Sequence, residues 1–593
     1  MGIPQFKRHL EPYTQRAAIE PGDVVLDGPA LAYHVLALCS RATRKTSPFE
    51  QPSYELLGKV AVAWLEKIQA CGLSVVAIYF DGYLPDSKRA ERIQRLIKSS
   101  RDLIKYHSAF LAGVPPSNPH HAVDGVVDLF PNAWPGEKKA KPPPPPFLVP
   151  AVIDALRESP KFGPRVELVP GEADGFCADH VRRHGGTILT SDSDLLVHDL
   201  GEAGAVVFFA DVDADPQTER LIAPQYQSRT LCRRLSIQAE TGLQRIAFEV
   251  SRDPHLTLQQ AVERAKKSGP SSAFPEEYSD FIKQYHSPEV SPNLKTDWVV
   301  ALDPRVSEIV LRSLAGLEIA TGVSEPGSQV GNGLEVYLPF LLDCPSRTSA
   351  WEASKPLRQL AYALLLSNYG SSIPSISEMR RMQSISSGTQ VDVPGPAQVD
   401  ELGNSLLALL SKLEAGVSKA ELIWPLLSIY HDIVMTLNRA RGYPLSLDIL
   451  DQEARGTLDE RSWEFIHFLA QTQAVCYSLR MLLQILQFSA RSTGTLSATM
   501  SALAKLLSRL PSLADFPSPR TFAETLRVLR EAEGLSCLRS LCADYKDIIQ
   551  HIQAIGKPKN IPRSKKNRST TSAEVQTRSR STNPFDLLAS SGE

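Results

Sequence analysis

The chain has 593 residues, more than one hydrophobic core usually supports, so two or more domains are expected. Hydrophobic residues make up 42% and charged residues 22%, as in an ordinary globular protein. The net charge of -2 excludes a chain that is basic throughout, so any surface that binds nucleic acid must be local. No apolar run reaches the roughly 18 residues of a membrane span, and the eight cysteines form no CxxC pair. We therefore expect an intracellular protein with reduced thiols and no membrane contact.

Up to about residue 260, short apolar runs alternate with segments of helical periodicity. Three of the runs end in aspartate, at 23–28 (DVVLDG), 73–82 (LSVVAIYFDG) and 187–194 (TILTSDSD). The helical segments are Tyr54–Ala70, Asp86–Ala112, Val149–Glu158 and Ala173–Arg183. This alternation predicts an α/β domain over 1–260 with a mainly parallel, twisted sheet.

Residues 113–147 interrupt this domain with a segment rich in proline, glycine and charge. Its five consecutive prolines favour a stiff polyproline II spacer. We interpret 113–147 as a proline-rich insertion, either a plain linker or a ligand for an SH3 or WW domain.

The chain from 261 to 555 is predicted to form a second, mostly α-helical domain. Leucine and alanine recur at helical spacing over 352–368, 397–414, 418–441, 459–490, 494–509 and 519–553. Ser/Gly/Pro-rich joints are expected near 370–396. We expect this domain to offer a surface for a protein partner.

The tail, 556–593, is predicted to be disordered and basic. It holds eight Lys and Arg residues against three acids, a local charge of +5, and few apolar side chains. Such a cluster is typical of a nuclear localisation signal or of a nonspecific nucleic-acid contact, and a solvated tail without function is the alternative.

Six acidic residues follow or flank the predicted strands of the first domain. They are Asp27, Asp81, Glu172, Asp174, Asp192 and Asp194. Since ligands gather at the carboxyl ends of parallel strands, these carboxylates should converge and repel one another unless cations bind between them. Oxygen ligands without Cys or His indicate Mg²⁺ or Mn²⁺. Two such ions are the usual arrangement for hydrolysis of a phosphodiester.

Five motifs occur in a fixed order: MGIPQF, VVLDGPALAY, YFDGYLPDSK, PGEADGFCADH and TSDSDLLVHDLG. In this order they resemble the N and I regions of the XPG/flap endonuclease superfamily, with the Asteroid branch as the nearest match. The resemblance covers about residues 1–260 and implies a PIN-like nuclease domain that holds two Mg²⁺ or Mn²⁺ ions through the six acids.

The resemblance also assigns residues that contact nucleic acid. Lys88 and Arg95 match the basic residues that the family aims at the scissile phosphate, and Arg92 lies between them on the same basic helix. Tyr33 matches an aromatic position that stacks on a base, and a core tyrosine is the alternative. Gly2 matches the family's free N-terminus near the site.

Two features depart from the family pattern. The seventh carboxylate of the family corresponds to Asp253, but Ser-Arg replaces the expected glycine-containing turn. The glycine-rich helix–hairpin–helix that grips duplex phosphates is replaced by LTLQQAVERAKK. Substrate preference is therefore left open by the resemblance.

These features favour a metal-dependent, structure-specific nuclease that cleaves flap or junction DNA in repair or replication. We expect it in the nucleus and also consider the cytoplasm, and RNA stays open as a substrate. The alternative from another class is a catalytically inactive PIN scaffold that regulates by binding RNA or protein. Retention of all six acids argues against it, since a regulator has no use for mutually repelling carboxylates.

Overall fold

The computed structural model describes Ile3 and residues 5–43, 51–115, 127–131, 143–215, 217–218, 220–239, 241–267, 274–285, 299–320, 334–367, 373–381, 388–439, 442–531 and 533–556. Residues Met1–Ile555 form one compact unit. Gly556–Glu593 form a second unit, of which only Gly556 is described. The tail predicted to be basic and disordered thus lies outside the described residues.

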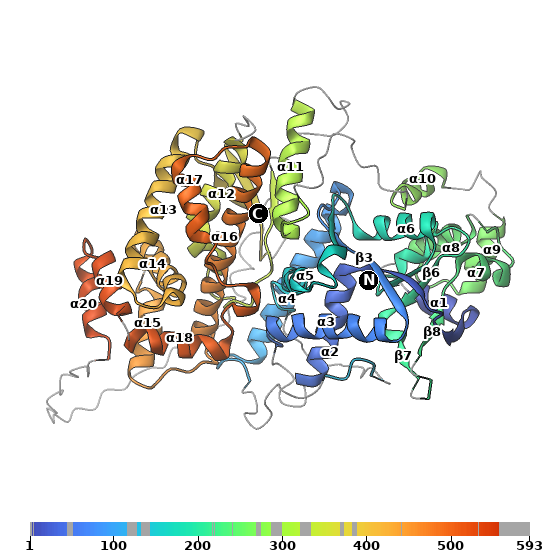
Figure 1. Ribbon diagram of the computed structural model, residues 1–593, viewed down its shortest axis with the longest axis horizontal. Helices are drawn as coiled ribbons and strands as arrows, with labels where there is room; N and C mark the ends of the chain where they lie inside the picture. The colour runs from blue at the N-terminus through green and yellow to red at the C-terminus, as the bar shows by residue number, and fades with distance from the viewer. Residues whose placement is uncertain are drawn as a thin grey trace, which may run out of the picture. The chain divides into compact units, whose positions relative to one another are not determined.

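A five-stranded, all-parallel sheet forms the centre of the N-terminal part, with strand order β4-β3-β2-β5-β6 (Figure 1). Its strands are β2 (Gly22–Asp27), β3 (Leu73–Asp81), β4 (Val166–Val169), β5 (Thr187–Thr190) and β6 (Ala205–Phe208). The predicted α/β architecture with a mainly parallel sheet is confirmed.

Both faces of this sheet are covered, as parallel sheets require. Successive side chains of β2 point to opposite faces, so Val24 and Leu26 enter one hydrophobic cluster and Val25 enters another. Helices α2 (Gly28–Thr43), α3 (Tyr54–Ala70) and α5 (Leu148–Glu158) pack into the first cluster. Helices α6 (Ala173–His184) and α8 (Gly242–Arg252) pack into the second (Figure 1).

The helices predicted in this part agree closely with the observed ones. Helix α3 has the predicted bounds and begins where Ser53 Oγ accepts a hydrogen bond from Leu56 N at 3.1 Å. The segment predicted as one helix over Asp86–Ala112 is a 3₁₀ turn, η2 (Asp86–Lys88), followed by α4 (Arg89–Ala109).

The N-terminal part holds further elements besides the main sheet and the helices that cover it. A three-stranded antiparallel sheet has the order β1-β8-β7. The elements are α1 (Phe6–Leu10), η1 (Glu11–Tyr13), β1 (Gln15–Ala18), η3 (Gly163–Arg165), η4 (Ser193–Leu196), η5 (Phe209–Asp211), β7 (Asp213–Ala214), β8 (Leu221–Gln225), α7 (Ser228–Leu235), α9 (Leu258–Lys267) and α10 (Pro275–Lys283).

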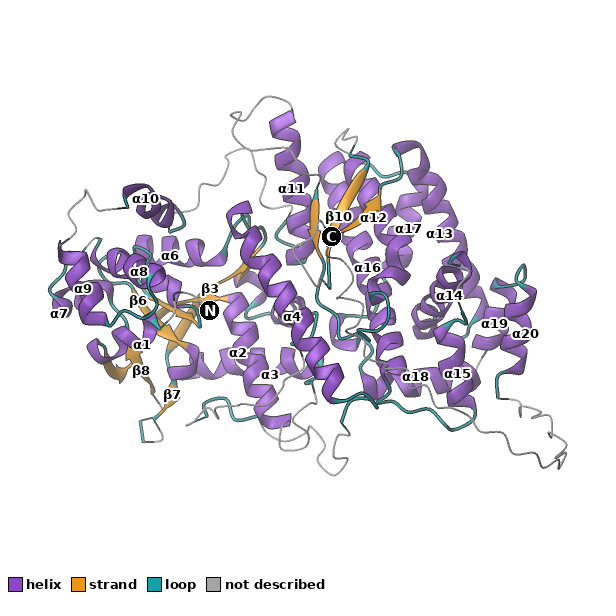
Figure 2. Ribbon diagram, turned by 180° about the vertical axis from the view of Figure 1, so that it is seen from behind, coloured by secondary structure: helices purple, strands orange, loops and turns teal. Residues whose placement is uncertain are grey.

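The later part of the chain is mostly helical, as predicted (Figure 2). Its helices are α11 (Pro304–Ala320), η7 (Ala350–Ser354), α12 (Lys355–Ser367), α13 (Pro396–Gly416), η8 (Ala420–Leu422), α14 (Ile423–Asn438), α15 (Leu445–Ala454), α16 (Trp463–Thr493), α17 (Ala498–Leu507), η9 (Leu513–Asp515), α18 (Pro519–Glu531), α19 (Gly534–Leu541) and α20 (Lys546–Ala554). The single segment predicted over 519–553 is therefore three helices.

A third sheet, also of three strands, lies within this helical part and was not predicted. Strand β10 (Ser375–Met379) pairs in parallel with β9 (Glu335–Tyr337) and antiparallel with β11 (Thr389–Asp392). The segment 370–396 was predicted to be a joint because serine, glycine and proline dominate it. Part of it forms the middle of this sheet instead.

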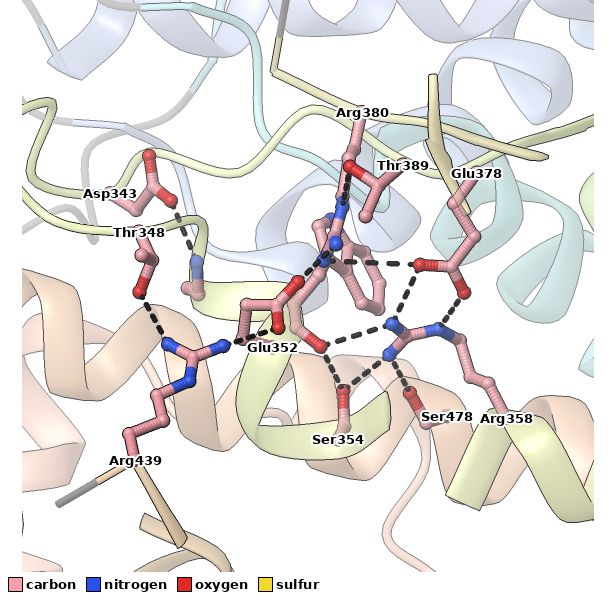
Figure 3. Close-up of polar contacts among 12 residues, drawn as sticks. Asp343, Thr348, Glu352, Ser354, Arg358, Glu378, Arg380, Thr389, Arg439 and Ser478 are labelled. Carbon is pink, nitrogen blue, oxygen red and sulfur yellow. Dashed lines mark hydrogen bonds and ion pairs between the residues drawn. The ribbon is translucent and has the colours of Figure 1, made fainter. Parts of the chain in front are cut away.

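Buried charges anchor β10 (Figure 3). Arg358 of α12 is fully buried and donates to Glu378 of β10 at 2.6 and 2.9 Å. Arg380, next to β10, pairs with Glu352 of η7, which also binds Arg439 at 2.6 Å. Because each buried charge has a partner of opposite sign, the network fixes the strand against η7 and α12.

The N-terminal and helical parts share one core. Phe147, just before α5, stacks on Tyr477 of α16 with ring centroids 4.6 Å apart. Arg480 of α16 donates to Asp154 of α5 at 2.8 Å and to Asp303 at 2.7 and 2.8 Å. A domain division at residue 260 stays a prediction.

The proline-rich insertion is described at its edges and at 127–131, where Phe130 lies 6.1 Å from Trp64 between ring centroids. Four of its five consecutive prolines, residues 143–146, are described and lead into α5. Among the helices that the structure describes, none combines the length and apolar character of a membrane span.

Candidate metal and nucleic-acid site

Four adjacent strands bring acidic residues to one edge of the main sheet. Asp27 ends β2, and Asp81 ends the neighbouring β3. Glu172 is the N-cap of α6 after β4, and Asp192 is the N-cap of η4 after β5. Because all these strands are parallel, the four acids meet at the carboxyl edge, where ligands bind in such sheets.

The carboxylates lie near enough to one another to raise each other's pKa values. Burial, with the charges of Asp81 and Asp192, raises the pKa of Asp27 to about 7. Burial raises the pKa of Asp174 well above its usual range, and Asp27, Asp192, Asp81 and Glu172 add to this effect. These neighbours lie near enough to resist ionisation of one another.

The pKa values of Asp81 and Asp194 are raised as well. Burial raises the pKa of Asp81 to about 6, with Glu172 adding to the rise. Burial also raises the pKa of Asp194 to about 6, with Asp192 adding to it. All six acids predicted from the sequence are thus brought together.

Hydrogen bonds fix the orientation of these carboxylates. Asp27 accepts from Thr190 Oγ1 at 2.6 Å and from Ala30 N at 3.1 Å. Asp81 accepts from Ala173 N at 2.8 Å, and Asp194 accepts from Ile3 N at 2.8 Å. The N-terminal segment therefore reaches the site through Ile3.

The chemistry of the donor set fits a hard divalent cation, since every candidate ligand is a carboxylate oxygen and the six acids outnumber the lysine paired with them, Lys88. Within the described ranges, however, no three or more His, Cys, Asp or Glu side chains are already arranged to hold a metal ion. Cation binding at this edge stays a prediction, and Asp27, Asp81, Glu172, Asp174, Asp192 and Asp194 are the residues that could provide it.

The run at 187–194 is a strand only over its first four residues, β5. The strand ends at Thr190, and Ser193 and Asp194 lie in the 3₁₀ turn η4. Asp192 Oδ1 caps this turn by accepting from Asp194 N at 3.1 Å. Aspartate favours such local caps, which explains why the strand stops early.

Lys88 reaches the cluster, and Arg95 does not contact it in this structure. The Lys88 Nζ lies 3.3 Å from Glu172 Oε1. Burial opposes its charge, but Glu172 and Asp194 raise the pKa of Lys88, so the ammonium group stays protonated. The Arg95 side chain is 54% exposed and pairs with Glu91 one turn earlier in α4.

Arg92 was predicted to contact nucleic acid, but the structure places it in a buried ion pair. Its guanidinium is buried and forms a two-pronged ion pair with Glu308 of α11, with Arg92 Nη2 at 2.8 Å from Oε2. With a side chain that is 8% exposed and paired to Glu308, Arg92 is placed to hold α4 against α11 and not to meet a phosphate.

Tyr33 and Gly2 were also predicted to contact nucleic acid, and the structure describes only Tyr33. Tyr33 of α2 is 44% exposed, which excludes the alternative of a core tyrosine and leaves its ring free to meet a base. Gly2 lies outside the described residues.

Asp253 is not brought to the cluster by any recorded contact. It caps the end of α8, accepts from His255 N at 3.2 Å and lies 3.9 Å from Arg264. Its side chain is 42% exposed, whereas Asp27 of the site is 4% exposed.

Tyr285 and His198 are neighbours of the cluster that the sequence did not indicate. Their ring centroids lie 5.2 Å apart. Burial raises the pKa of the Tyr285 phenol, and four acids, led by Asp194, add to the rise. Tyr285 follows α10, which packs on α8 through Phe281 and Phe248. Because Tyr285 is placed near the acids by the packing of α10 on α8, the sequence around residue 285 contains no motif that would indicate it.

The fold and the site define an α/β protein with an acidic edge, and one comparison with known proteins agrees with this class. Residues 144–393 match the protein family described as XPG domain containing. The match supports an XPG/PIN-like nuclease superfamily and a nuclease-type function, which implies binding of nucleic acid. No curated protein matches the chain significantly.

The matched range includes Glu172, Asp174, Asp192 and Asp194, whereas Asp27, Asp81 and Lys88 precede it. It also continues past residue 260, through α11 to β11.

Proposed function

We propose that the protein is a divalent-metal-dependent, structure-specific nuclease of the Asteroid branch. Its substrate is branched or flap DNA, and its place is DNA repair or replication in the nucleus. The observation that carries the proposal is the meeting of six carboxylates at the edge of four parallel strands, with Lys88 beside them.

Mg²⁺ or Mn²⁺ bound by these carboxylates would supply an activated water and would neutralise charge that develops on the phosphate. The chain's own residues orient the substrate. The Lys88 ammonium, protonated and 3.3 Å from Glu172, can bind a phosphate oxygen next to the acids. Arg95 lies farther along α4 with an exposed side chain, where it can contact a neighbouring phosphate.

Tyr33 would stack on a base near the site. It lies one and a half turns after Asp27 and is the exposed aromatic residue of α2. Stacking of this kind contributes roughly 1 to 3 kcal/mol per base.

The test is cleavage of end-labelled flap, splayed-arm, duplex and single-stranded RNA substrates in Mg²⁺. Wild type should cleave a branched DNA, and Asp192→Asn/Asp194→Asn should lose at least about 100-fold in rate. Asp199→Asn is the matched control, since this acid lies on the same connection but only caps a turn at Gly201. Cleavage by the double variant at the wild-type rate would refute the site.

Lys88→Gln should lower kcat by about 100-fold, because it removes a charge from the reacting phosphate. Arg95→Gln should chiefly raise KM. Absence of cleavage by wild type on every substrate, with binding of RNA or protein retained, would instead support the inactive scaffold.

A further inference from the structure

The segment that carries Lys88 needs support from outside the main sheet. Lys88 ends the 3₁₀ turn η2, and its ion pair with Glu172 is partly exposed on both sides. A partly exposed ion pair contributes about 1 kcal/mol or less, too little to hold a side chain at a reacting atom. Contacts with residues beyond 300 supply the missing support.

Helix α11 holds the segment before Lys88. Arg312 donates to Asp86 Oδ1 at 2.7 Å and to the carbonyl oxygen of Leu84 at 3.0 Å. Gly82 lies so close to Ser307 that an added Cβ would come within 2.9 Å of its hydroxyl oxygen. The connection from β3 to α4 thus packs directly on α11.

Glu308 of α11 holds the segment after Lys88. It accepts both prongs of Arg92 and also pairs with Arg312 at 3.2 Å. The side chains of Arg92 and Glu308 are 8% and 5% exposed. Burial opposes the charge, but Arg92, Arg305 and Arg312 together hold the pKa of Glu308 below its usual range. One carboxylate therefore ties both sides of the segment to one helix.

Strand β9 adds a second support. Glu335 accepts from Arg89 Nε at 2.9 and 3.0 Å, and the Arg92 guanidinium lies 3.5 Å from the centre of the Tyr337 ring. Ile93 and Ile97 of α4 pack on Tyr337 and on Met379 of β10. Since β10 is anchored by the buried network of Figure 3, β9 offers a rigid surface.

We propose that Glu308 and Glu335 are positioning residues, through which α11 and β9 hold the segment from Gly82 to Arg92 so that Lys88 stays at the acidic edge. The part of the chain beyond residue 300 is then a component of the catalytic site. This inference rests on the proposed nuclease function for its activity readout, and its structural readout is independent of that function.

The test compares Glu308→Gln with Glu453→Gln. Glu453 also forms an ion pair between helices, with Arg530 at 2.6 Å, but it lies in α15, away from the segment. Glu308→Gln should lower kcat by about 10- to 100-fold with KM and Mn²⁺ binding little changed, because misplacement of a catalytic group costs rate more than binding. Glu453→Gln should leave kcat unchanged.

The structural readout is amide hydrogen exchange of peptides covering 82–92, together with acylation of Lys88 measured by mass spectrometry. Both should rise several-fold in Glu308→Gln and stay at the wild-type level in Glu453→Gln. If Glu308→Gln does not fold, Glu335→Gln, which keeps the α11 contacts, should show the same changes to a smaller extent.

Unchanged exchange, Lys88 reactivity and kcat in a folded Glu308→Gln or Glu335→Gln would overturn the inference. Faster exchange and higher Lys88 reactivity in a protein whose wild type cleaves no substrate would refute the proposed nuclease and leave the positioning role standing.

Discussion

An acid at the sheet edge, such as Asp27, can be a metal ligand and at the same time lower the stability of the folded protein when it is ionised. Asp27 is 4% exposed, with a pKa raised to about 7 mainly by burial. A group held in this way favours its neutral form, so the folded protein binds protons that the unfolded chain releases. We therefore expect bound cations to favour the ionised form of the cluster.

A pH-dependent stability difference follows for Asp194. Its pKa rises from 3.8 to about 6 on folding, so wild type loses stability relative to Asp194→Asn as the pH rises through this window. The asparagine keeps the acceptor for Ile3 N and removes the charge. In EDTA the variant should match wild type near pH 4 and exceed it by up to about 3 kcal/mol at pH 8, at about 1.4 kcal/mol per unit.

Urea unfolding at the two pH values, in EDTA and in Mg²⁺, measures this difference. Mg²⁺ should stabilise wild type and narrow or reverse the gap. A variant that is no more stable than wild type at pH 8 in EDTA would contradict the account.

The role of the six acids as metal ligands stays a prediction. The sequence indicated Asp27, Asp81 and Asp192 because each follows an apolar run, and Glu172 and Asp174 because they lie at the start of a helix. It failed for Arg92, whose partner Glu308 is 216 residues away. A basic helix looks the same in sequence whether its arginines are solvated or buried against distant acids. Tyr285 was missed for the same reason.

At the scale of elements, periodicity predicted several of the long helices and three of the five strands of the main sheet, β2, β3 and β5. Strands β4 and β6 were not predicted. It missed β9, β10 and β11, which have only three to five residues and include the charged Glu335 and Glu378. Those side chains are held by ion pairs with Arg89 and Arg358. Short strands stabilised by paired charges lack the apolar alternation that marks a strand.

The junction between β3 and α4 gives a test at this scale. A Cβ on Gly82 would overlap the carbonyl oxygen of Val169, to which Gly82 N donates at 2.8 Å. Gly82→Ala should therefore destabilise the protein by about 1 to 3 kcal/mol and displace Asp81.

Gly22→Ala is the control, because a Cβ there would meet only Glu20 O at 3.9 Å. Its effect should stay within about 0.5 kcal/mol in the same urea titration. Equal stability of the two variants would show that the connection between β3 and α4 does not pack against Val169 as the structure has it.

At the scale of the whole molecule, the described residues up to Ile555 behave as one unit. Leu103 and Tyr106 of α4 are buried against Cys344, Trp463 and Ile466. The face of α4 is thus covered by residues that lie far beyond 260.

A chain that ends at residue 260 should therefore lose cooperative unfolding, because it exposes this face of α4 and the ring of Phe147. A chain that ends at Gly556 should unfold as full-length protein does, in one transition. Circular dichroism melts compare them. A cooperative transition of the shorter chain at the full-length midpoint would show that the N-terminal part folds alone.

The central claim is that the acidic edge binds divalent cations. Calorimetric titration of the full chain with Mn²⁺ near pH 6.5 tests it most directly. Wild type should bind Mn²⁺ with release of protons, because carboxyl groups with raised pKa values must ionise on binding. Binding should be lost in Asp27→Asn/Asp192→Asn and kept in Asp199→Asn. A wild type that binds no Mn²⁺, or a double variant that binds as tightly as wild type, would contradict the account.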